Sequence, residues 1–385
     1  MPLPTTTTDL PTVTNPGPFG HQQRKNFLFP ENFTQYNHGS YGAFPKVVQD
    51  DKIAWHQHAE RDIDRWMRRE LRPALADIRA RVAEVIHCDK DELALVTNTT
   101  VGVNTVLRSL DFQPGDRILQ FSTGYMSVDK TVRYICDTIP DVQLIEVPIT
   151  FPLTDQEILD KVENTVKTHQ QLKDGSRIRL AMVDWISSVP SIVHPIKQLV
   201  ELLQGYGILV YVDGAHSIGQ VHVDLADLHP DFYITNCHKW LFSVRGSAVL
   251  YVPKHHQHLI HPTAITADYK TGFVNEFAWM GTQDYSSLMS IRSAIDFRKQ
   301  HGGEDAIISY THSLAVAGGK AVAEILGTEG VTPLKGHDHQ IGNMVNIRLP
   351  IKNLNNPKVN IYLELEDFVR IGNVWKKVID ELNAE

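Results

Sequence analysis

The sequence predicts an α/β protein built on a mostly parallel sheet with helices on both faces. Short apolar segments such as "ELALVTN" and "GILVYVDGAHS" each run into a polar or small-residue turn, which is typical of buried strands. Helix-like segments such as "TVRYICDTI" and "PIKQLVELLQGYG" lie between them. Regular alternation of strands and helices favours a parallel sheet covered by helices on both sides.

The alternation starts at about Asp77. The segment "ADIRARVAEVIH" and the residues before it place Leu75, Ile78, Val82 and Val85 on one helical stripe. Strands are expected next in "ELALVTN", "GDRILQFST", "RIRLAMVDWISS" and "GILVYVDGAHS". Together these segments predict one large domain.

A last unit starts at about Gly330. Its segments "NMVNIRLPI" and "KVNIYLEL" are strand-like, and "DFVRIGNVWKKVIDEL" reads as a closing helix. This order predicts a small C-terminal α/β layer. The length of 385 residues also suits a large domain with a smaller one.

Composition restricts the class of protein. The hydrophobic content of 42% and the charged content of 21% are ordinary for a globular protein. The net charge of -8 argues against nucleic-acid binding. Three scattered cysteines predict neither a disulfide framework nor a metal site, and they indicate a reducing, cytoplasmic location. The Pro- and Thr-rich start, 1–18, is expected to be a disordered tail, and no run has the length of a membrane span.

Chemistry is expected where the strands end. In open α/β sheets, ligands bind at the carboxyl ends of the strands. The residues that follow the predicted strands are Asn98, Thr99, Thr100, Tyr125, Ser187, Ser188, Asp213 and His216.

Lys239 lies between a His and a Trp in "TNCHKW", just after the apolar run "DFYI". A lysine in this setting either lays its stem on the aromatic ring as a surface residue or serves as an imine-forming amine. Asp213 follows "ILVYV", so its carboxylate must be paired or must cap the next turn. Together, a lysine and an acid fit pyridoxal phosphate, which needs an amine for its aldehyde and an acid for its ring nitrogen.

A phosphate site is expected in "TNTTVGVNTVL", where a strand end meets a helix start. Exposed backbone N–H groups and the helix dipole attract anions there. A plain helix cap of Asn and Thr gives the same pattern. Tyr125, in "STGYMS", either stacks on a flat cofactor or belongs to the core.

The long segment "VDGAHSIGQVHVDLADLHPDFYITNCHKWLFSVRGSAVLYV" resembles class V aminotransferase-like pyridoxal phosphate enzymes. Within that class it is most similar to the isopenicillin N epimerase-like branch, which includes ergothioneine-pathway C–S lyases and a loline-pathway enzyme. "YNHGSYGAFP" and "FAWMGTQDYSSLMSIRSAIDFR" match the same branch. The resemblance spans roughly residues 19–348. It implies fold type I, with a seven-stranded sheet in the large domain.

The resemblance also implies roles for single residues. Lys239 would bind the cofactor covalently, Asp213 would face the pyridine nitrogen, and His216 would contact the ring hydroxyl or the lysine. Further cofactor contacts would come from Thr99, Thr100, Tyr125, Ser188, Asn236 and His238. Thr282 would reach the phosphate in a neighbouring subunit, which implies a homodimer. Asn37, His38 and Ser40 would belong to a loop that closes over the substrate.

The resemblance divides the chain into a tail (1–18), an N-terminal arm (19–75), a large cofactor-binding domain (76–300) and a small domain (301–385). It predicts an enzyme of specialised metabolism that acts on an amino acid or a cysteine- or homoserine-type conjugate, by C–S or Cβ/Cγ lyase chemistry. Epimerisation and transamination are alternatives, because they begin with the same loss of the Cα proton. No metal ion and no partner beyond the substrate and a second copy are expected.

This sequence differs from its relatives at two points that affect which reaction is expected. Cysteine desulfurases use a cysteine on a C-terminal loop, and no cysteine follows Cys237. Cys237 itself is expected to be a structural thiol, because neighbours in a strand-like segment point apart. Relatives also carry a C-terminal arginine that binds the substrate carboxylate; the stretch "NLNNPKVNIYLELEDF" lacks it and looks shortened. Arg245 and Arg348 are possible substitutes or surface ion pairs, and a cofactor-binding protein with impaired turnover is a further alternative.

Overall fold

The computed structural model describes residues 19–170, 176–330, 337–348, 350 and 372–377. The expected tail, the segment "KVNIYLEL" and most of the closing helix lie outside these residues. Of the closing helix, 372–377 is described and is helical. "NMVNIRLPI" is not a regular strand in its described part, since Ile347 forms only an isolated bridge with Gly330.

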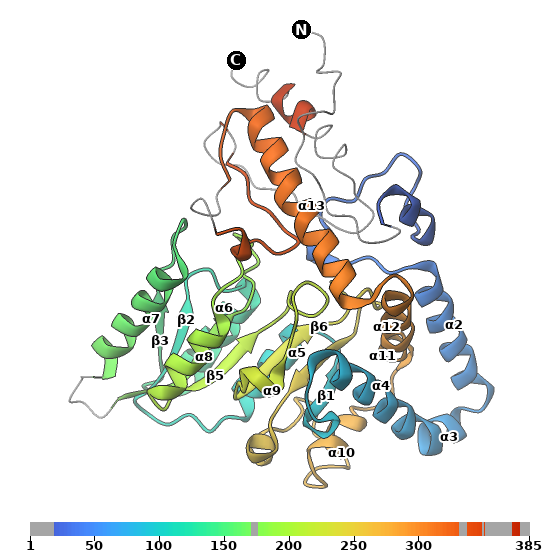
Figure 1. The fold of residues 1–385 in the computed structure, drawn as a ribbon. Coiled ribbons are helices and arrows are strands. Elements are labelled where there is room, and N and C mark those ends of the chain that lie inside the picture. The colour runs from blue at the N-terminus through green and yellow to red at the C-terminus, as the bar shows by residue number, and fades with distance from the viewer. Residues whose placement is uncertain (1–18, 171–175, 331–336, 349, 351–371, 378–385) are drawn as a thin grey trace.

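A seven-stranded sheet forms the centre of the large domain (Figure 1). In space the strands follow the order β1-β7-β6-β5-β4-β2-β3. β7 is antiparallel to β1 and β6, and the other neighbouring pairs are parallel. The mostly parallel sheet predicted from the sequence is therefore confirmed. The strands are β1 Leu93–Val96, β2 Asp116–Phe121, β3 Gln143–Val147, β4 Arg177–Asp184, β5 Leu209–Asp213, β6 Phe232–Asn236 and β7 Ala248–Tyr251.

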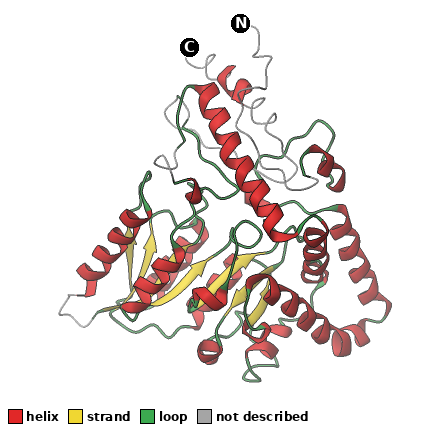
Figure 2. Ribbon diagram, viewed as in Figure 1, coloured by secondary structure: helices red, strands yellow, loops and turns green. Residues whose placement is uncertain are grey.

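Helices cover both faces of this sheet (Figure 2). The α-helices are α1 His38–Tyr41, α2 Lys46–Arg61, α3 Ile63–Arg65, α4 Leu71–Ile86, α5 Thr99–Ser109, α6 Met126–Thr138, α7 Asp155–Gln170, α8 Ile196–Gly205, α9 Leu225–Leu228, α10 Phe273–Ala278, α11 Ser286–Met289, α12 Ile291–Gln300 and α13 Gly303–Leu326. A π-helical turn, η3 Trp66–Glu70, joins α3 to α4. The 3₁₀ turns are η2 His21–Asn26, η4 Lys90–Glu92, η5 Lys254–Leu259 and η6 Asp338–Gln340.

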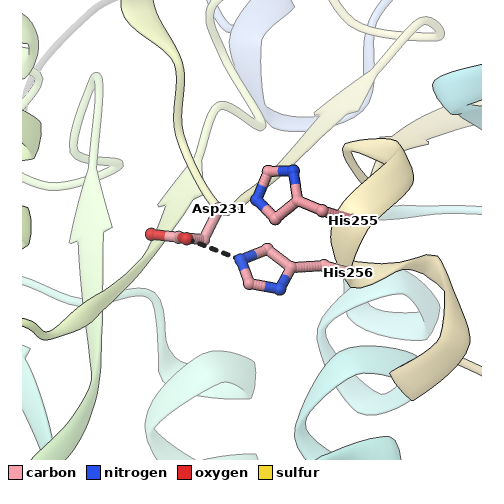
Figure 3. A group of neighbouring side chains, drawn as sticks. All are labelled: Asp231, His255 and His256. Atoms are coloured by element: carbon pink, nitrogen blue, oxygen red, sulfur yellow. Dashed lines mark hydrogen bonds and ion pairs between the residues drawn. The ribbon is translucent and has the colours of Figure 1, made fainter.

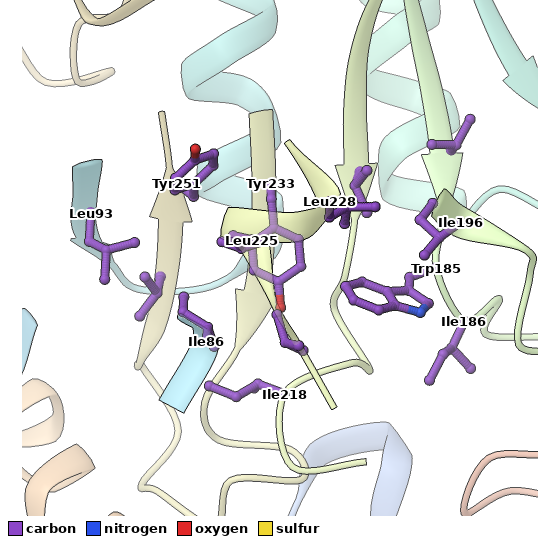
Figure 4. Close-up of a cluster of buried hydrophobic side chains, with 14 of the residues drawn as sticks. Ile86, Leu93, Trp185, Ile186, Ile196, Ile218, Leu225, Leu228, Tyr233 and Tyr251 are labelled. Atoms are coloured by element: carbon purple, nitrogen blue, oxygen red, sulfur yellow. The ribbon is translucent and has the colours of Figure 1, made fainter. Parts of the chain in front are cut away.

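The alternating residues of β5 show how the sheet separates two apolar cores. Val210 and Val212 pack into a core with α4, α7 and α8, whereas Tyr211 packs on the opposite face with α5, α6 and α10. This alternation follows from the two-residue period of a strand. Part of the first core is drawn in Figure 4, where Trp185 and Tyr233 lie among aliphatic side chains.

The predicted stripe on α4 is correct except at its end. Leu75, Ile78 and Val82 are buried, but Val85 is only partly buried and Ile86 is fully buried in its place. A third core joins the N-terminal arm to α13, with Phe19 and Phe27 packed among α13 side chains. None of the described helices combines the length and apolar composition that crossing a bilayer requires.

Gly42 brings the N-terminal arm against the chain at Lys239. Its φ of +68° is in the left-handed region, and a Cβ there would lie 1.7 Å from the carbonyl oxygen of His238. Only glycine allows this approach without displacing one of the two backbones. The carbonyl oxygen of Lys239 is also bonded, at 2.8 Å, by Nε2 of His38.

We therefore expect Gly42→Ala to destabilise the protein by about 2–4 kcal/mol, from left-handed strain and overpacking together. Gly207→Ala is the matched control, because Gly207 has a φ of +73° and nothing lies within 4 Å of the position that an added methyl group would take. That control is expected to cost only about 1–2 kcal/mol. Chemical denaturation of both variants measures the difference, and equal losses would contradict a close approach at Gly42.

Candidate active site

A cavity of about 160 Å³ lies where the strands end. Its walls come from the turns after β1, β2, β4, β5 and β6 and from the loop at α1. The parallel sheet brings these turns to one edge. The lining residues are Ser40, Tyr41, Asn98, Thr99, Thr100, Tyr125, Asp184, Ile186, Ser188, Asp213, Ala215, His216, Asn236, His238 and Lys239.

The sequence predicted most of this lining and missed part of it. Ten of the residues predicted for the cofactor or substrate line the cavity: Ser40, Thr99, Thr100, Tyr125, Ser188, Asp213, His216, Asn236, His238 and Lys239. Asp184 was missed, although it ends an apolar strand just as Asp213 does. Tyr41 was also missed; it is 74% exposed at the end of the four-residue helix α1, which is too short for a sequence period to mark.

The cavity wall does not include three of the described residues that the resemblance assigned to the site: Asn37, His38 and Thr282. His38 is fully buried, and burial lowers its pKa to about 3. This placement favours a structural role for His38. Asn37 accepts a hydrogen bond from the Ser40 hydroxyl at 2.7 Å. Thr282 is exposed and outside the lining.

Lys239 and His216 form the centre of the site. Nζ of Lys239 lies 2.9 Å from Nε2 of His216. His216 is 3% exposed, and its Nδ1 accepts a hydrogen bond from the indole N–H of Trp240 at 3.2 Å. The lysine is thus a partly buried amine with an imidazole beside it. That imidazole belongs to His216, for which the resemblance implied a contact with the ring hydroxyl or the lysine, and not to the sequence neighbour His238.

Asp213 and Asp184 form a buried pair of carboxyl groups. They are register partners on neighbouring parallel strands, so their side chains lie on the same side of the sheet. Burial raises the pKa of both, and the charge of Asp213 raises that of Asp184 further. The N–H of Ala215 opposes the shift at Asp213, and a positive charge on Lys239 would oppose it further. Asp213 is therefore the member of the pair that ionises first, and Asp184 is the member that keeps its proton longer.

The start of α5 offers an anion site. Asn98 caps the helix by accepting the Val101 N–H at 2.9 Å, and the Thr99 N–H donates to Asn236 at 3.0 Å. The hydroxyl of Thr99 is buried, and none of the residues that the structure describes bonds it. A buried hydroxyl at a helix N-terminus fits an oxyanion that would complete its hydrogen bonding.

His238 lies across the same end of the cavity as a neutral ring. Its Nδ1–H donates to the carbonyl oxygen of Ser247 at 3.1 Å, and burial lowers its pKa to about 4. Nε2 of this neutral ring is an acceptor. A contact from His238 to a phosphate oxygen thus needs a proton on one of the two partners.

The remaining predicted residues lie outside the cavity wall. Cys237 is completely buried and burial raises the pKa of its thiol, in keeping with a structural role. Arg348 pairs with Glu329 at 3.7 Å on the surface. Arg245 donates to the carbonyl oxygen of Gly42 at 3.4 Å, next to the loop that contributes Ser40.

A second cluster, Asp231, His255 and His256, lies apart from the cavity (Figure 3). Its ligand atoms are within 4.8 Å of one another, as a metal ion would require. The carboxylate of Asp231 is engaged by Nε2 of His256 at 2.8 Å and by the backbone N–H of Val210 at 2.8 Å. Gln204 donates to the same carboxylate at 3.0 Å. These hydrogen bonds explain why a carboxylate lies here: Asp231 holds the start of β5 in place.

Comparisons with known proteins agree with this geometry. The sequence profile of "Aminotransferase class-V" matches residues 54–368. An L-cysteine desulfhydrase-like protein, lolT1 of Epichloe uncinata, is 33% identical, over 87% of this chain and 79% of its own. Hercynylcysteine sulfoxide lyase of Schizosaccharomyces pombe is 27% identical, over 91% of this chain and 90% of its own. A solved structure of a C-DES mutant, with glycine covalently linked to its PLP cofactor, superposes with a TM-score of 0.78 at 17% identity, over 92% of this chain and 98% of its own.

The hydroxyl of Thr99 provides a test of the anion site. We expect Thr99→Val to lower the affinity for pyridoxal phosphate about tenfold, the value of one hydrogen bond to a charged group. The affinity for pyridoxal, which has no phosphate, should stay the same. Stability without ligand should not fall, because the variant removes an unbonded buried hydroxyl. Spectroscopic titrations with both compounds measure this, and equal losses for both would contradict a phosphate at Thr99.

Proposed function

The chain belongs to the aminotransferase class-V family, and on this premise we propose that it is a pyridoxal phosphate-dependent C–S lyase. The observation that carries the proposal is one cavity that holds a lysine amine, a buried carboxylate and an unbonded hydroxyl at a helix start. Relatives named as a cysteine desulfhydrase-like protein and a sulfoxide lyase favour cleavage at sulfur. Isopenicillin N epimerase of Amycolatopsis lactamdurans matches at 26% identity over 82% of this chain, against 33% over 87% for the desulfhydrase-like protein, so epimerisation is the weaker candidate.

The residues present fit this cofactor. Lys239 would bind its aldehyde, Asp213 would face its ring nitrogen, and the start of α5 with Thr99 would hold its phosphate. When bound, pyridoxal phosphate stabilises the negative charge that develops at the substrate's Cα. Asp213, the member of the pair that ionises first, suits a partner for a protonated ring nitrogen, and Asp184 beside it keeps its proton longer.

The protein's own groups would handle the proton. Nζ of Lys239, as an uncharged amine at the cavity wall, would be the base that takes the proton from the substrate's Cα. Loss of that proton allows the Cβ–S bond to break, and the sulfur leaves with the bonding electron pair and is protonated to a thiol. Water then releases the remaining fragment as a keto acid and ammonia. Tyr41 and Tyr125, both at the cavity wall, would limit access of bulk water.

We expect the cofactor-loaded protein to release sulfide from cysteine, or a thiol from an S-substituted cysteine, together with keto acid and ammonia in equal amounts. Asp213→Asn should lower kcat by about 100-fold or more, because a neutral amide cannot hold the ring nitrogen protonated. Asp184→Asn is the matched control on the neighbouring strand, with an expected loss of less than about tenfold, because Asn resembles a protonated Asp.

Product assays by thiol reagent and by keto-acid reduction measure this reaction. With an S-substituted cysteine, transamination would instead yield a keto acid that keeps the C–S bond and no free thiol, and epimerisation would yield neither product. A protein that binds the cofactor but changes none of the cysteine conjugates would support the alternative of impaired turnover. Near-native kcat in Asp213→Asn, or an equal loss in Asp184→Asn, would contradict the roles assigned here.

We also propose that the protein is a homodimer in which Thr282 serves the partner's site. Thr282 is exposed and outside its own cavity. Large apolar side chains on and near the N-terminal arm are exposed in the single chain, among them Tyr41, Val47 and Met126. Such exposure suits a face that a second copy covers. A cytoplasmic location fits the free thiols of all three cysteines, and a role in specialised metabolism stays a prediction.

Mixing two inactive variants tests the shared site. Thr282→Ala and Lys239→Ala chains should each be inactive or strongly impaired alone. After mixing and refolding, about a quarter of the original activity should return, because half of the dimers are mixed and each has one intact site. Sedimentation should show a dimer at micromolar concentration. A monomer, or no recovery of activity in the mixture, would leave Thr282 as an ordinary turn residue.

A further inference from the structure

Trp240 is the residue next to Lys239 and is 1% exposed. Its indole N–H donates to Nδ1 of His216 at 3.2 Å, and Nε2 of the same ring lies 2.9 Å from Nζ of Lys239. An indole N–H can only donate. Nδ1 of His216 must therefore carry a lone pair and no proton.

The state of Nδ1 determines the protonation of Nε2 at the other end of the ring. A neutral imidazole with no proton on Nδ1 has its proton on Nε2. His216 then presents an N–H to Nζ of Lys239, and only an uncharged amine has a lone pair to accept it. An ammonium at Lys239 would place two donors against each other across 2.9 Å. An imidazolium at His216 would do the same against Trp240.

We propose that Trp240 is a positioning residue that fixes His216 with its proton on Nε2, so that His216 donates to Lys239 and Lys239 stands as an uncharged amine. The inference deepens the proposed function, because an uncharged amine is the form that attacks an aldehyde. A phenylalanine at 240 would fill much of the same space without an N–H to donate. The side chain at position 240 thus influences the protonation of Lys239 through His216.

The indole is held in place from several sides. Arg298, itself 1% exposed, donates to the carbonyl oxygen of Trp240 at 2.8 Å and to that of Gly219 at 3.1 Å. A Cβ on Gly219 would lie 2.5 Å from the same Trp240 oxygen, so the two backbones are in close contact. The ring of His38 lies 5.1 Å from the indole. The backbone of Trp240 is thus held by Arg298 and Gly219, and one side of its buried indole packs against His38.

Other charged groups around the amine come from each packed element. Asp213 on β5 favours an ammonium when it is ionised, and burial raises the pKa of Asp184 on β4 further than that of Asp213. His238 and His38 are neutral rings. Arg298 on α12 lies behind Trp240. The hydrogen bond from His216 favours the uncharged amine of Lys239, whereas Asp213 favours its ammonium form. A loss of the Trp240 N–H should therefore shift the pH at which Lys239 loses its proton.

The test is the pH profile of acetylation of Lys239 by acetic anhydride, which reacts with uncharged amines. The full-length chain is stripped of cofactor, labelled across pH, and mapped by peptide mass. Lys130, which is 70% exposed, is the internal reference. In the wild type the midpoint for Lys239 should lie at least about one pH unit below that for Lys130, and Trp240→Phe should raise it by about half a unit to one unit.

Two variants separate positioning from packing. Trp66→Phe, at a Trp that is 3% exposed in the first core, should leave the midpoint unchanged. In a His216→Leu background, Trp240→Phe should also have no further effect, because an aliphatic side chain has no proton to present to Lys239. An unchanged midpoint in Trp240→Phe, or the same shift with and without His216, overturns the proposal.

A second measurement does not depend on any variant folding. ¹⁵N NMR of the histidine-labelled wild-type chain at neutral pH should show His216 protonated on Nε2 only. A proton on Nδ1 overturns the proposal. Neither measurement needs turnover, so failure of the lyase assay leaves this inference standing. Conversely, an active lyase with a failed tautomer test overturns the role of Trp240 alone.

Discussion

The site depends on one constraint: the turn that carries Lys239 is buried, and each of its backbone groups must find a partner inside the protein. Two backbone hydrogen bonds close the turn. The N–H of Cys237 donates to the carbonyl oxygen of Ser247, and the N–H of Ser243 donates to the carbonyl oxygen of Cys237. The carbonyl oxygens of Lys239 and Trp240 are bonded by His38 and Arg298. These bonds hold the lysine rigidly while its side chain enters the cavity.

This constraint explains why distant segments meet here. His38 and Lys239 are 201 positions apart, and Arg298 is 58 positions from Trp240. The N-terminal arm packs against the turn through Gly42, where a larger residue would collide with His238. The arm is thus part of the site's scaffold as well as a source of Ser40 and Tyr41 at the cavity wall.

Burial also determines the charge pattern. It lowers the pKa of His38 to about 3 and that of His238 to about 4, so both rings are neutral near pH 7. It raises the pKa of Asp184 more than that of Asp213, so Asp213 is the first of the carboxyl pair to ionise. In a low-dielectric site with few charges, each remaining charge has a large effect. In the proposed function, an anion at Asp213 and the polar start of α5 would orient a cofactor with a charged ring at one end and a phosphate at the other.

The sequence by itself determined the fold class, because strand and helix periods are local properties of the chain. It also determined which residues meet at one edge of the sheet: Thr99, Tyr125, Asp213 and Lys239 each follow a strand or a strand-like run. Only the tertiary structure decided what surrounds them. The burial of His38, the pairing of Asp184 with Asp213 and the bond from Trp240 to His216 depend on how separate strands and loops pack. Local periodicity contains no distance between such segments, and so it could not distinguish a substrate contact from a structural one.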